Sequence, residues 1–251
     1  MARQTGIIQL TGTIGNITFY KSQDGMMAKE KTHISREKIL HAPCYERTRE
    51  NMREFACANE ASKHIFNMTR SFSRSASDNR FHSRLVKIMQ QVLRMDTYNI
   101  RGCRTIAEGI KTDEGKALLR HFNFNKHSNL GRILRRPYVL NPVTGEIVLE
   151  NVCPVIDFAS PRGATHVSLK SAFAGILFTE AKIDIEYSGS VDLPLDTSVH
   201  TVRLNIPVLP VLTDESIAFY FLKAEFYQMT NDIKYLMNDG TYNSLELIEV
   251  L

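Results

Sequence analysis

The sequence has no tryptophan, only four cysteines and no long apolar run. The cysteines are widely spaced and form no CxxC pair, which predicts reduced, mostly buried thiols rather than a disulfide framework. No apolar run approaches the roughly 20 residues that cross a bilayer, so we expect no membrane span. The first ten residues lack the sustained apolar stretch of a secretory signal, so we expect a cytoplasmic protein.

Common catalytic and cofactor-binding motifs are also missing. There is no glycine-rich phosphate loop, no GxGxxG, no HExxH and no GxSxG. His33, His41 and Cys44 are the nearest approach to a zinc site, but they are scattered over a polar stretch and are more typical of ordinary exposed residues. The sequence therefore predicts no metal and no cofactor.

Two further groups of reactive side chains deserve a chemical interpretation. Cys103 with His121 or His127 would supply a nucleophile and a base, but no motif fixes their geometry, and a structural thiol is the simpler interpretation. Asp184 and Glu186 share one face of a predicted strand, as paired acids require, although such pairs usually form the solvated side of a sheet. We therefore expect that the protein is not an enzyme.

Charge is distributed very unevenly along the chain. Residues 1–140 contain 25 Lys and Arg against 12 Asp and Glu, whereas residues 141–251 contain 6 against 15. The first part therefore carries a net charge of +13 and the second a net charge of −9, which sum to the +4 of the whole chain. The sequence is polarised into a basic front and an acidic back.

Three interpretations of this polarity stay open. The basic front could neutralise nucleic-acid phosphates and release their counterions. It could instead meet the acidic back of the next copy, giving a head-to-tail contact that closes into a ring or continues as a filament. In the third interpretation both parts are merely solvated, or they meet inside one molecule.

The first part of the chain predicts a hairpin followed by helices. Residues 6–31 have strand character, and Asp24-Gly25 between two strand-like runs indicates a hairpin turn. Residues 32–44 are expected to form a linker, and a helix is expected from Tyr45 to about residue 66, ended by a serine-rich loop at 71–77. A second helix is expected after an N-cap at Asp78, with apolar residues spaced four and three apart. A short third helix is expected at 113–121, capped by Thr112.

After about residue 132 the pattern changes to short β-branched runs divided by turn residues. A hairpin is expected at 138–149, with further strands at 152–158, 164–172, 175–188, 198–206, 215–229 and 243–250. Seven or eight short strands are typical of an immunoglobulin-like antiparallel β-sandwich. The predicted fold class is α+β, with an N-terminal β-hairpin arm and linker at 1–44, a helical region built on a helical hairpin at 45–131 and a β-sandwich domain at 132–251.

Several segments resemble a widespread uncharacterised protein family of Bacteroidetes. The resemblance is carried by GTIGNITFYK at 12–21 and RTREN at 47–51, and by shorter matches such as Asp78-Asn79-Arg80, Gly163-Ala164-Thr165-His166 and Glu225-Phe226-Tyr227-Gln228. It extends along nearly the whole chain and implies one shared architecture in a bacterial protein, but it brings no activity, cofactor or site residues.

The hypothesis that these features favour is a structural subunit without enzymatic activity. Its partner would be a second copy of the chain, bound head-to-tail in a filament, a ring or a phage-like virion or tail component. The alternative is a nucleic-acid-binding protein that uses the same basic front. Candidate assembly-interface residues are Phe19, Tyr20, Lys21, Arg47, Arg49, Arg53, Arg80, Arg84, Arg135 and Arg136.

Overall fold

The computed structural model describes residues 1–31, 34–231 and 233–251. The chain forms two compact units, Met1–Arg49 and Glu50–Leu251. Their boundary lies near the start of helix α2 (Glu46–Ser73). The boundary expected at residues 131 and 132 falls inside the second unit.

The first unit is a four-stranded antiparallel sheet with the strand order β1-β4-β3-β2. Its elements are β1 (Ala2–Arg3), β2 (Gly12–Ile14), β3 (Ile17–Ser22), β4 (Gly25–Glu30), α1 (Arg36–His41) and the 3₁₀ turn η1 (Pro43–Tyr45). The hairpin turn lies where Asp24-Gly25 predicted it, with Ser22 opposite Gly25. Gly25 has a φ of 107°, a backbone angle that glycine adopts without strain.

The strand expected from residue 6 onward does not form. Residues 4–11 make a loop between β1 and β2, and Ile7, Ile8 and Leu10 are exposed on it. Gln4 closes the base of this loop: its side chain donates to the carbonyl of Leu10 and accepts from the backbone N–H of Leu10 at 2.9 Å. The backbone polar groups at the neck are therefore satisfied by one side chain rather than by a ladder.

The helices of the second unit begin with α2. The others are α3 (Phe81–Arg94), α4 (Ile106–Gly109), α5 (Asp113–Leu119), α6 (Leu130–Ile133) and α7 (Pro154–Asp157). Helix α2 continues through Ser73, so the loop expected at 71–77 begins later than predicted. Its polar residues fit a helix because Ser62 and Thr69 donate to the carbonyls four residues earlier, each at 2.7 Å, while Phe72 is buried.

The N-termini of α3 and α5 differ in how they are capped. Thr112 caps α5 as predicted, accepting from the backbone N–H of Gly115 at 3.0 Å. The N-cap of α3 is Arg80, which makes no side-chain capping bond, so the prediction of Asp78 as the cap is wrong. Asp78 lies two residues earlier and accepts from the backbone N–H of Arg80 at 2.7 Å.

The remaining strands form two sheets. The larger sheet has seven strands in the order β10-β8-β12-β14-β5, with β9 beside β8 and β13 beside β12; the smaller has the order β11-β7-β6. The strands are β5 (Phe122–Asn123), β6 (Val139–Leu140), β7 (Ile147–Val152), β8 (His166–Leu177), β9 (Lys182–Tyr187), β10 (Val191–Pro194), β11 (His200–Leu204), β12 (Ile217–Thr230), β13 (Ile233–Leu236) and β14 (Ser244–Val250), with the 3₁₀ turn η2 at Met237–Gly240.

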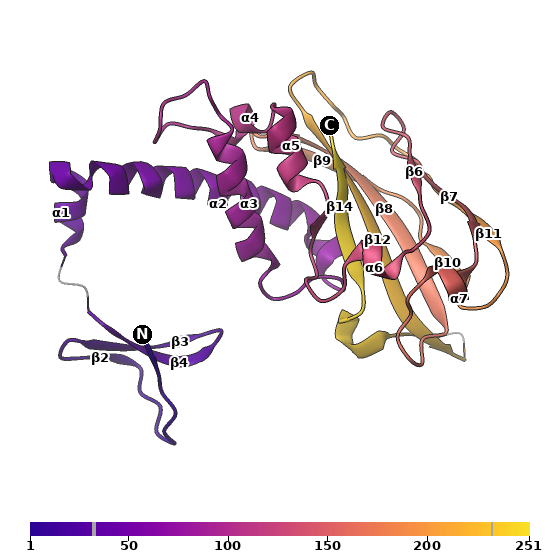
Figure 1. Ribbon diagram of the computed structural model, residues 1–251, viewed down its shortest axis with the longest axis horizontal. Helices are drawn as coiled ribbons and strands as arrows, with labels where there is room; N and C mark the ends of the chain where they lie inside the picture. Colours follow the sequence, from indigo (N-terminus) through magenta and orange to yellow (C-terminus); the bar gives the residue numbers. More distant parts are fainter. Residues whose placement is uncertain (32–33, 232) are drawn as a thin grey trace. The chain divides into compact units, whose positions relative to one another are not determined.

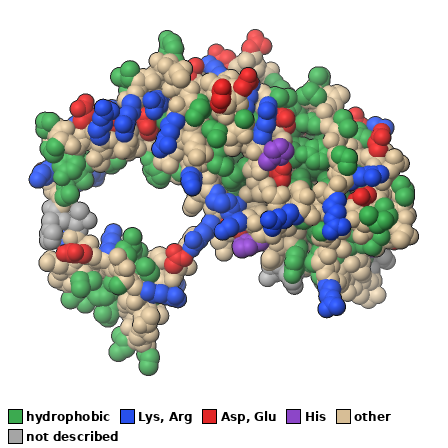
Figure 2. Space-filling view, in the orientation of Figure 1, with side chains coloured by type: hydrophobic (Ala, Val, Ile, Leu, Met, Phe, Trp, Pro, Cys, Tyr) green, Lys and Arg blue, Asp and Glu red, His purple; other side chains and the backbone are tan. Residues whose placement is uncertain are grey.

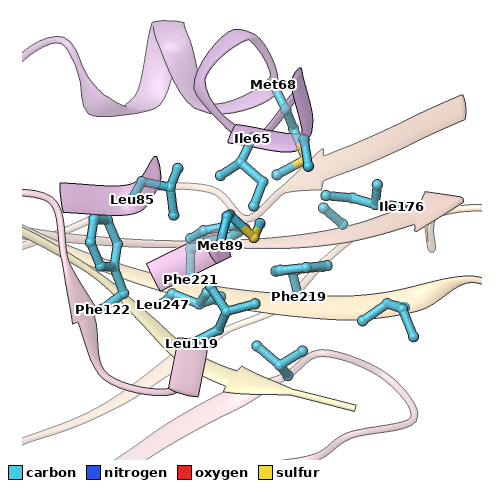
Figure 3. Close-up of a cluster of buried hydrophobic side chains, with 14 of the residues drawn as sticks. Ile65, Met68, Leu85, Met89, Leu119, Phe122, Ile176, Phe219, Phe221 and Leu247 are labelled. Carbon is cyan, nitrogen blue, oxygen red and sulfur yellow. The ribbon is translucent and has the colours of Figure 1, made fainter. Parts of the chain in front are cut away.

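The second unit has three layers and two hydrophobic cores. Helices α2, α3 and α5 cover one face of the larger sheet, and the smaller sheet packs on the other face (Figure 1). Central strand β12 supplies both cores because its side chains alternate: Phe219 and Phe221 face the helices, whereas Tyr220 and Leu222 face the smaller sheet. Figure 3 shows side chains of the helix-covered core, with Met89 of α3 lying near Phe219 and Phe221.

This architecture is a mixed α+β fold with antiparallel sheets, as the sequence predicts. An immunoglobulin-like sandwich is not confirmed, because helices rather than solvent cover one face of the larger sheet. Two predicted strands are placed wrongly. Residues 154–157 form α7, which Pro154 begins. The break between β8 and β9 falls at 178–181 rather than at residues 173 and 174.

Candidate assembly surface

The sheet of the first unit has one apolar and one polar face. Directly opposed residues on neighbouring strands share a face, and Phe19 lies opposite both Gly12 and Ala28, while Ile17 lies opposite Ile14. The first face carries the apolar residues Ala2, Ile14, Ile17, Phe19, Met26 and Ala28, together with the charged residues Lys21 and Glu30. The second face is more polar and carries Arg3, Thr13, Thr18, Tyr20, Met27 and Lys29.

Very little of this apolar face is covered. Within the described part of the first unit, Met26 is the one buried hydrophobic side chain. Ile14 is 63% exposed and Ile17 is 46% exposed, although β-branched residues on the inner face of a sheet are normally packed. A sheet with one apolar face needs a second layer to be stable. The unit therefore presents a surface suited to packing against another protein surface.

The loop at residues 4–11 adds two more apolar side chains. Ile7 is fully exposed and Ile8 is 81% exposed, on a loop whose base is closed by Gln4. Figure 2 shows hydrophobic side chains gathered on the visible face of this unit. Apolar groups gathered on a surface in this way mark a contact site. We call the apolar face of the sheet together with Ile7 and Ile8 the arm surface.

Three of the predicted interface residues lie in this unit's sheet. Phe19 is half-buried on the apolar face, and Lys21 is exposed on the same face, opposite Met26. Tyr20 lies on the polar face, where its hydroxyl donates to the sulfur of Met1 at 3.0 Å and the ammonium of Lys29 lies 5.5 Å from the ring centre. Phe19 and Lys21 therefore belong to the arm surface, and Tyr20 does not.

The predicted arginines near the start of α2 have different roles. Arg49 is half-buried and donates to the carbonyls of Ile39 and Ala42, each at 2.9 Å, so it attaches α1 and its following turn to α2. Arg47 and Arg53 are exposed on the helix. Arg49 is thus occupied by the fold of its own unit.

Arg80 and Arg84 lie together in a polar groove of about 700 Å³ in the second unit. Arg84 pairs with the Asp78 carboxylate at 2.5 Å and donates to the carbonyl of Asn123 at 2.8 Å. Burial acts to raise the pKa of Asp78, but hydrogen bonds from the Lys126 backbone and from Arg84 outweigh it, so the pKa lies below its usual value. Arg84 is structural, and Arg80 is exposed at the rim.

Arg135 and Arg136 bind carbonyl groups of the second unit. Arg136 donates to the Glu150 carbonyl at 2.9 Å and lies 3.9 Å from the carboxylate of Asp157, and Arg135 makes a long contact of 3.4 Å with the Ile156 carbonyl. The ten predicted residues are therefore not one cluster. Arg49, Arg84 and Arg136 stabilise local structure.

The basic front and acidic back meet inside the second unit. Residues 50–251 contain 23 basic and 23 acidic residues, so this unit has no net charge, while residues 1–49 contain eight basic and four acidic ones. Arg120 pairs with Glu249, and His121 lies 2.8 Å from Glu246, which joins the front to the back directly. Of the two units, only the first keeps an excess of positive charge, four in net terms, so a head-to-tail hypothesis has to rest on this unit.

The other candidate groups are dispersed. All four cysteines are free, as expected, but none is buried, so the prediction of mostly buried thiols is wrong. His121 pairs with Glu246 rather than with Cys103. Asp184 accepts from the backbone N–H of Val211 at 2.7 Å and so holds a loop. His33 lies outside the described residues, and elsewhere in the described chain no three His, Cys, Asp or Glu side chains form a metal-binding group.

The exposed isoleucines of the loop were not among the predicted site residues. The signal that could have found them is the pair Ile7-Ile8 itself: two adjacent apolar residues cannot both face the core of a half-buried strand.

No helix in the described part of the chain has both the length and the apolar character needed to span a bilayer. Comparison with protein-family models, with curated proteins and with solved structures finds no match to the chain.

Proposed function

We propose that this protein is a structural subunit, without enzymatic activity, that assembles head-to-tail by docking its arm surface on the second unit of a neighbouring copy. The observation that supports this most directly is the arm itself, which folds into a sheet but leaves Ile7, Ile8, Ile14 and Ile17 in solvent. Burying the side chain of an isoleucine contributes about 1.5–3 kcal/mol, so an apolar surface of this kind favours association.

The second unit carries a surface that complements the arm. On the segment between β11 and β12, Val208 is 61% exposed and Val211 is 68% exposed, and the acidic residues Asp214 and Glu215 follow on the same segment. An apolar segment beside carboxylates suits an arm with apolar side chains and a surplus of four positive charges. Because donor and acceptor lie at different places on one chain, a second copy is the natural partner, and the contact is heterologous.

Sedimentation velocity at 1–50 µM tests this proposal. The wild-type chain should give species larger than the 28.6 kDa monomer. The variant Ile7→Ser/Ile8→Ser should lose about 3–6 kcal/mol of association, which is roughly two to four orders of magnitude in Kd. The control Ile100→Ser/Val143→Ser removes two other exposed apolar side chains, 78% and 76% exposed, and should assemble normally. Purely monomeric wild-type protein at 50 µM would contradict the proposal.

A mixing experiment tests the head-to-tail geometry. The acceptor variant Val208→Ser/Val211→Ser and the arm variant Ile7→Ser/Ile8→Ser should each remain monomeric alone. Mixed in equal amounts they should form a dimer, because the first still donates an intact arm and the second still offers an intact acceptor. If the mixture stays monomeric although the wild type assembles, the arm docks elsewhere.

Nucleic-acid binding is the second candidate, and one feature supports it. The polar groove beside Asp78 has Arg80, Lys126 and His127 along its lining, all exposed. Positively charged grooves of this kind bind phosphate backbones, with an affinity that falls steeply with salt. A gel-shift titration at 50 and 200 mM salt decides: retardation that is salt-sensitive and weakened by Lys126→Gln supports binding, and no retardation at 50 mM removes this candidate.

A further inference from the structure

Two lysines face each other in the middle of the larger sheet. Lys223 of β12 is directly opposite Lys170 of β8 in the antiparallel register. Both side chains lie on the helix-covered face, since Lys223 is two residues beyond Phe221 on the same strand and its ammonium lies 5.1 Å from the ring centre of Phe72 of α2. Like charges directly opposite one another in a sheet are destabilising, and lysine is almost never buried without a partner. The Lys223 side chain is only 7% exposed.

These lysines line a cavity of about 440 Å³ between α2 and the sheet. A third lysine, Lys234, also lines it. The volume lies within the range of small-molecule sites. Its walls combine aromatic and hydroxyl groups: Phe72, Tyr187, Tyr227, Ser168 and Ser190 all contribute.

The three ammonium groups are not equally satisfied. Lys223 lies 3.0 Å from the carboxylate of Glu225, and Lys234 pairs with Asp192. Lys170 has no carboxylate partner within the described residues, and its ammonium lies 5.1 Å from the ring of Tyr187 and 5.9 Å from that of Phe72. The cavity therefore holds one positive charge more than its carboxylates neutralise.

A buried tyrosine hydroxyl also lies in this cavity. The hydroxyl of Tyr227 is buried beside the carboxylate of Asp192, which also pairs with Lys234. Burial first, and then the Asp192 carboxylate, raise the pKa of Tyr227, so its hydroxyl keeps its proton. A ligand anion in the cavity can accept the hydrogen bond of this hydroxyl in place of Asp192, which keeps Lys234 as its partner.

We propose that this cavity binds a small organic anion, a carboxylate or phosphate group attached to a flat ring. The anionic group pairs with Lys170 and accepts a hydrogen bond from Tyr227, while the ring packs against Phe72 and Tyr187. A bound anion also relieves the repulsion between Lys170 and Lys223. This site is independent of the assembly proposed above.

Calorimetric titration with phenyl phosphate, benzoate and inorganic phosphate tests the proposal on the full chain. The two ring-bearing anions should bind more tightly than inorganic phosphate. Lys170→Gln should raise the Kd for phenyl phosphate about tenfold to a hundredfold, which corresponds to one lost charge-assisted hydrogen bond. Lys170→Arg, which keeps the charge, should bind within about threefold of the wild type.

Lys126→Gln is the matched control, because it removes one exposed lysine from the other basic groove. It should leave the Kd unchanged, and Tyr227→Phe should raise it about three- to tenfold. At one hundred times Kd, phenyl phosphate should raise the Tm of the wild type by about 5–10 °C. The proposal is overturned if none of the probes binds at 10 mM, or if Lys126→Gln loses binding while Lys170→Gln keeps it. Unchanged binding by Lys170→Gln alone also overturns it.

Discussion

Replacing Glu225 by Gln should destabilise the protein strongly, because the buried ammonium group of Lys223 loses its carboxylate partner. The Lys223 side chain is 7% exposed and that of Glu225 is 22% exposed, with their charged groups 3.0 Å apart. Removing one partner of a buried ion pair costs 3–5 kcal/mol, and the partial exposure of Glu225 reduces this to about 2–4 kcal/mol. For a chain of this size the Tm should fall by about 4–16 °C.

Thermal and urea unfolding of three variants measures this cost. We expect Lys223→Met/Glu225→Gln to be less destabilised than Glu225→Gln alone, because methionine fills the space of the lysine without its charge. The double-mutant cycle with Lys223→Met should give a coupling energy of about 1.5–3 kcal/mol. A loss below about 1 kcal/mol in Glu225→Gln, or additive effects within about 0.5 kcal/mol, would refute the reasoning.

The same variant should change the response of stability to alkaline pH. Burial lowers the pKa of Lys223, the Glu225 carboxylate raises it, and Lys170 lowers it, with a net pKa below the usual value. Between that folded pKa and the unfolded value of about 10.4, the unfolded chain binds more protons, so stability rises with pH. Glu225→Gln lowers the pKa of Lys223 in the folded state further, so the rise in the stability of this variant should begin at lower pH. Urea unfolding from pH 7 to 10 measures the stability of Glu225→Gln and of Lys223→Met, which lacks the titrating lysine. A difference in stability between the two variants that does not change with pH contradicts the prediction.

Three further substitutions probe the packing of the second unit. Asp96→Asn should cost about 2–4 kcal/mol, because the carboxylate accepts from the side chain of Asn99 and from three backbone N–H groups at 2.9–3.0 Å. Burial acts to raise the pKa of Asp96, but these hydrogen bonds outweigh it, so the pKa lies below its usual value. The stability of the wild type should therefore fall as the pH drops below about 4. Urea unfolding of Asp96→Asn should not show this loss at acid pH. Gly109→Ala should cost about 2–4 kcal/mol by thermal unfolding, because an added Cβ would lie 2.2 Å from the Val92 carbonyl oxygen; a loss below about 1 kcal/mol means that the helices move apart easily. Thr112→Ala should cost about 1 kcal/mol through loss of its cap, and an unchanged Tm would show that water replaces the hydroxyl.

The sequence predicts those elements well whose signals are local. The hairpin at Asp24-Gly25 forms because the turn residues fix its register, and α5 begins where Thr112 caps it. The apolar residues spaced four and three apart along α3 predict its buried face, and Leu85 and Val92 of that stripe lie in the core. These predictions need no knowledge of the rest of the chain.

The errors occur where packing decides between local alternatives. Serines near the end of α2 favour a loop by propensity, but burial of Phe72 extends the helix, and the hydroxyls of Ser62 and Thr69 bond within it. The break expected at residues 173 and 174 does not form, because Phe173 and Ala174 are buried within β8 and pair with β12. The local sequence does not show which distant residues pack against these segments.

The candidate sites were predicted only in part, for a physical reason. Arginines were selected for their charge, but Arg49, Arg84 and Arg136 each satisfy carbonyl groups or carboxylates of their own fold. A better signal was available in Lys223 and Glu225, two charged residues inside the otherwise apolar and aromatic segment 217–227. Such a position conflicts with the burial that the pattern predicts, and conflicts of this kind mark functional sites.

The charge polarity of the sequence has a different meaning once the chain is folded. A basic helical segment and an acidic sheet segment that pack on one another lose their net charge together, as the 23 basic and 23 acidic residues of the second unit do. Ion pairs such as Arg120 with Glu249 join the two segments within the subunit. In the assembly that we propose, a partner would meet the uncovered apolar surface of the arm and its surplus of four positive charges. Association driven by that surface depends on buried apolar area, and salt should weaken it far less than a contact built on the whole +13 and −9 of the sequence.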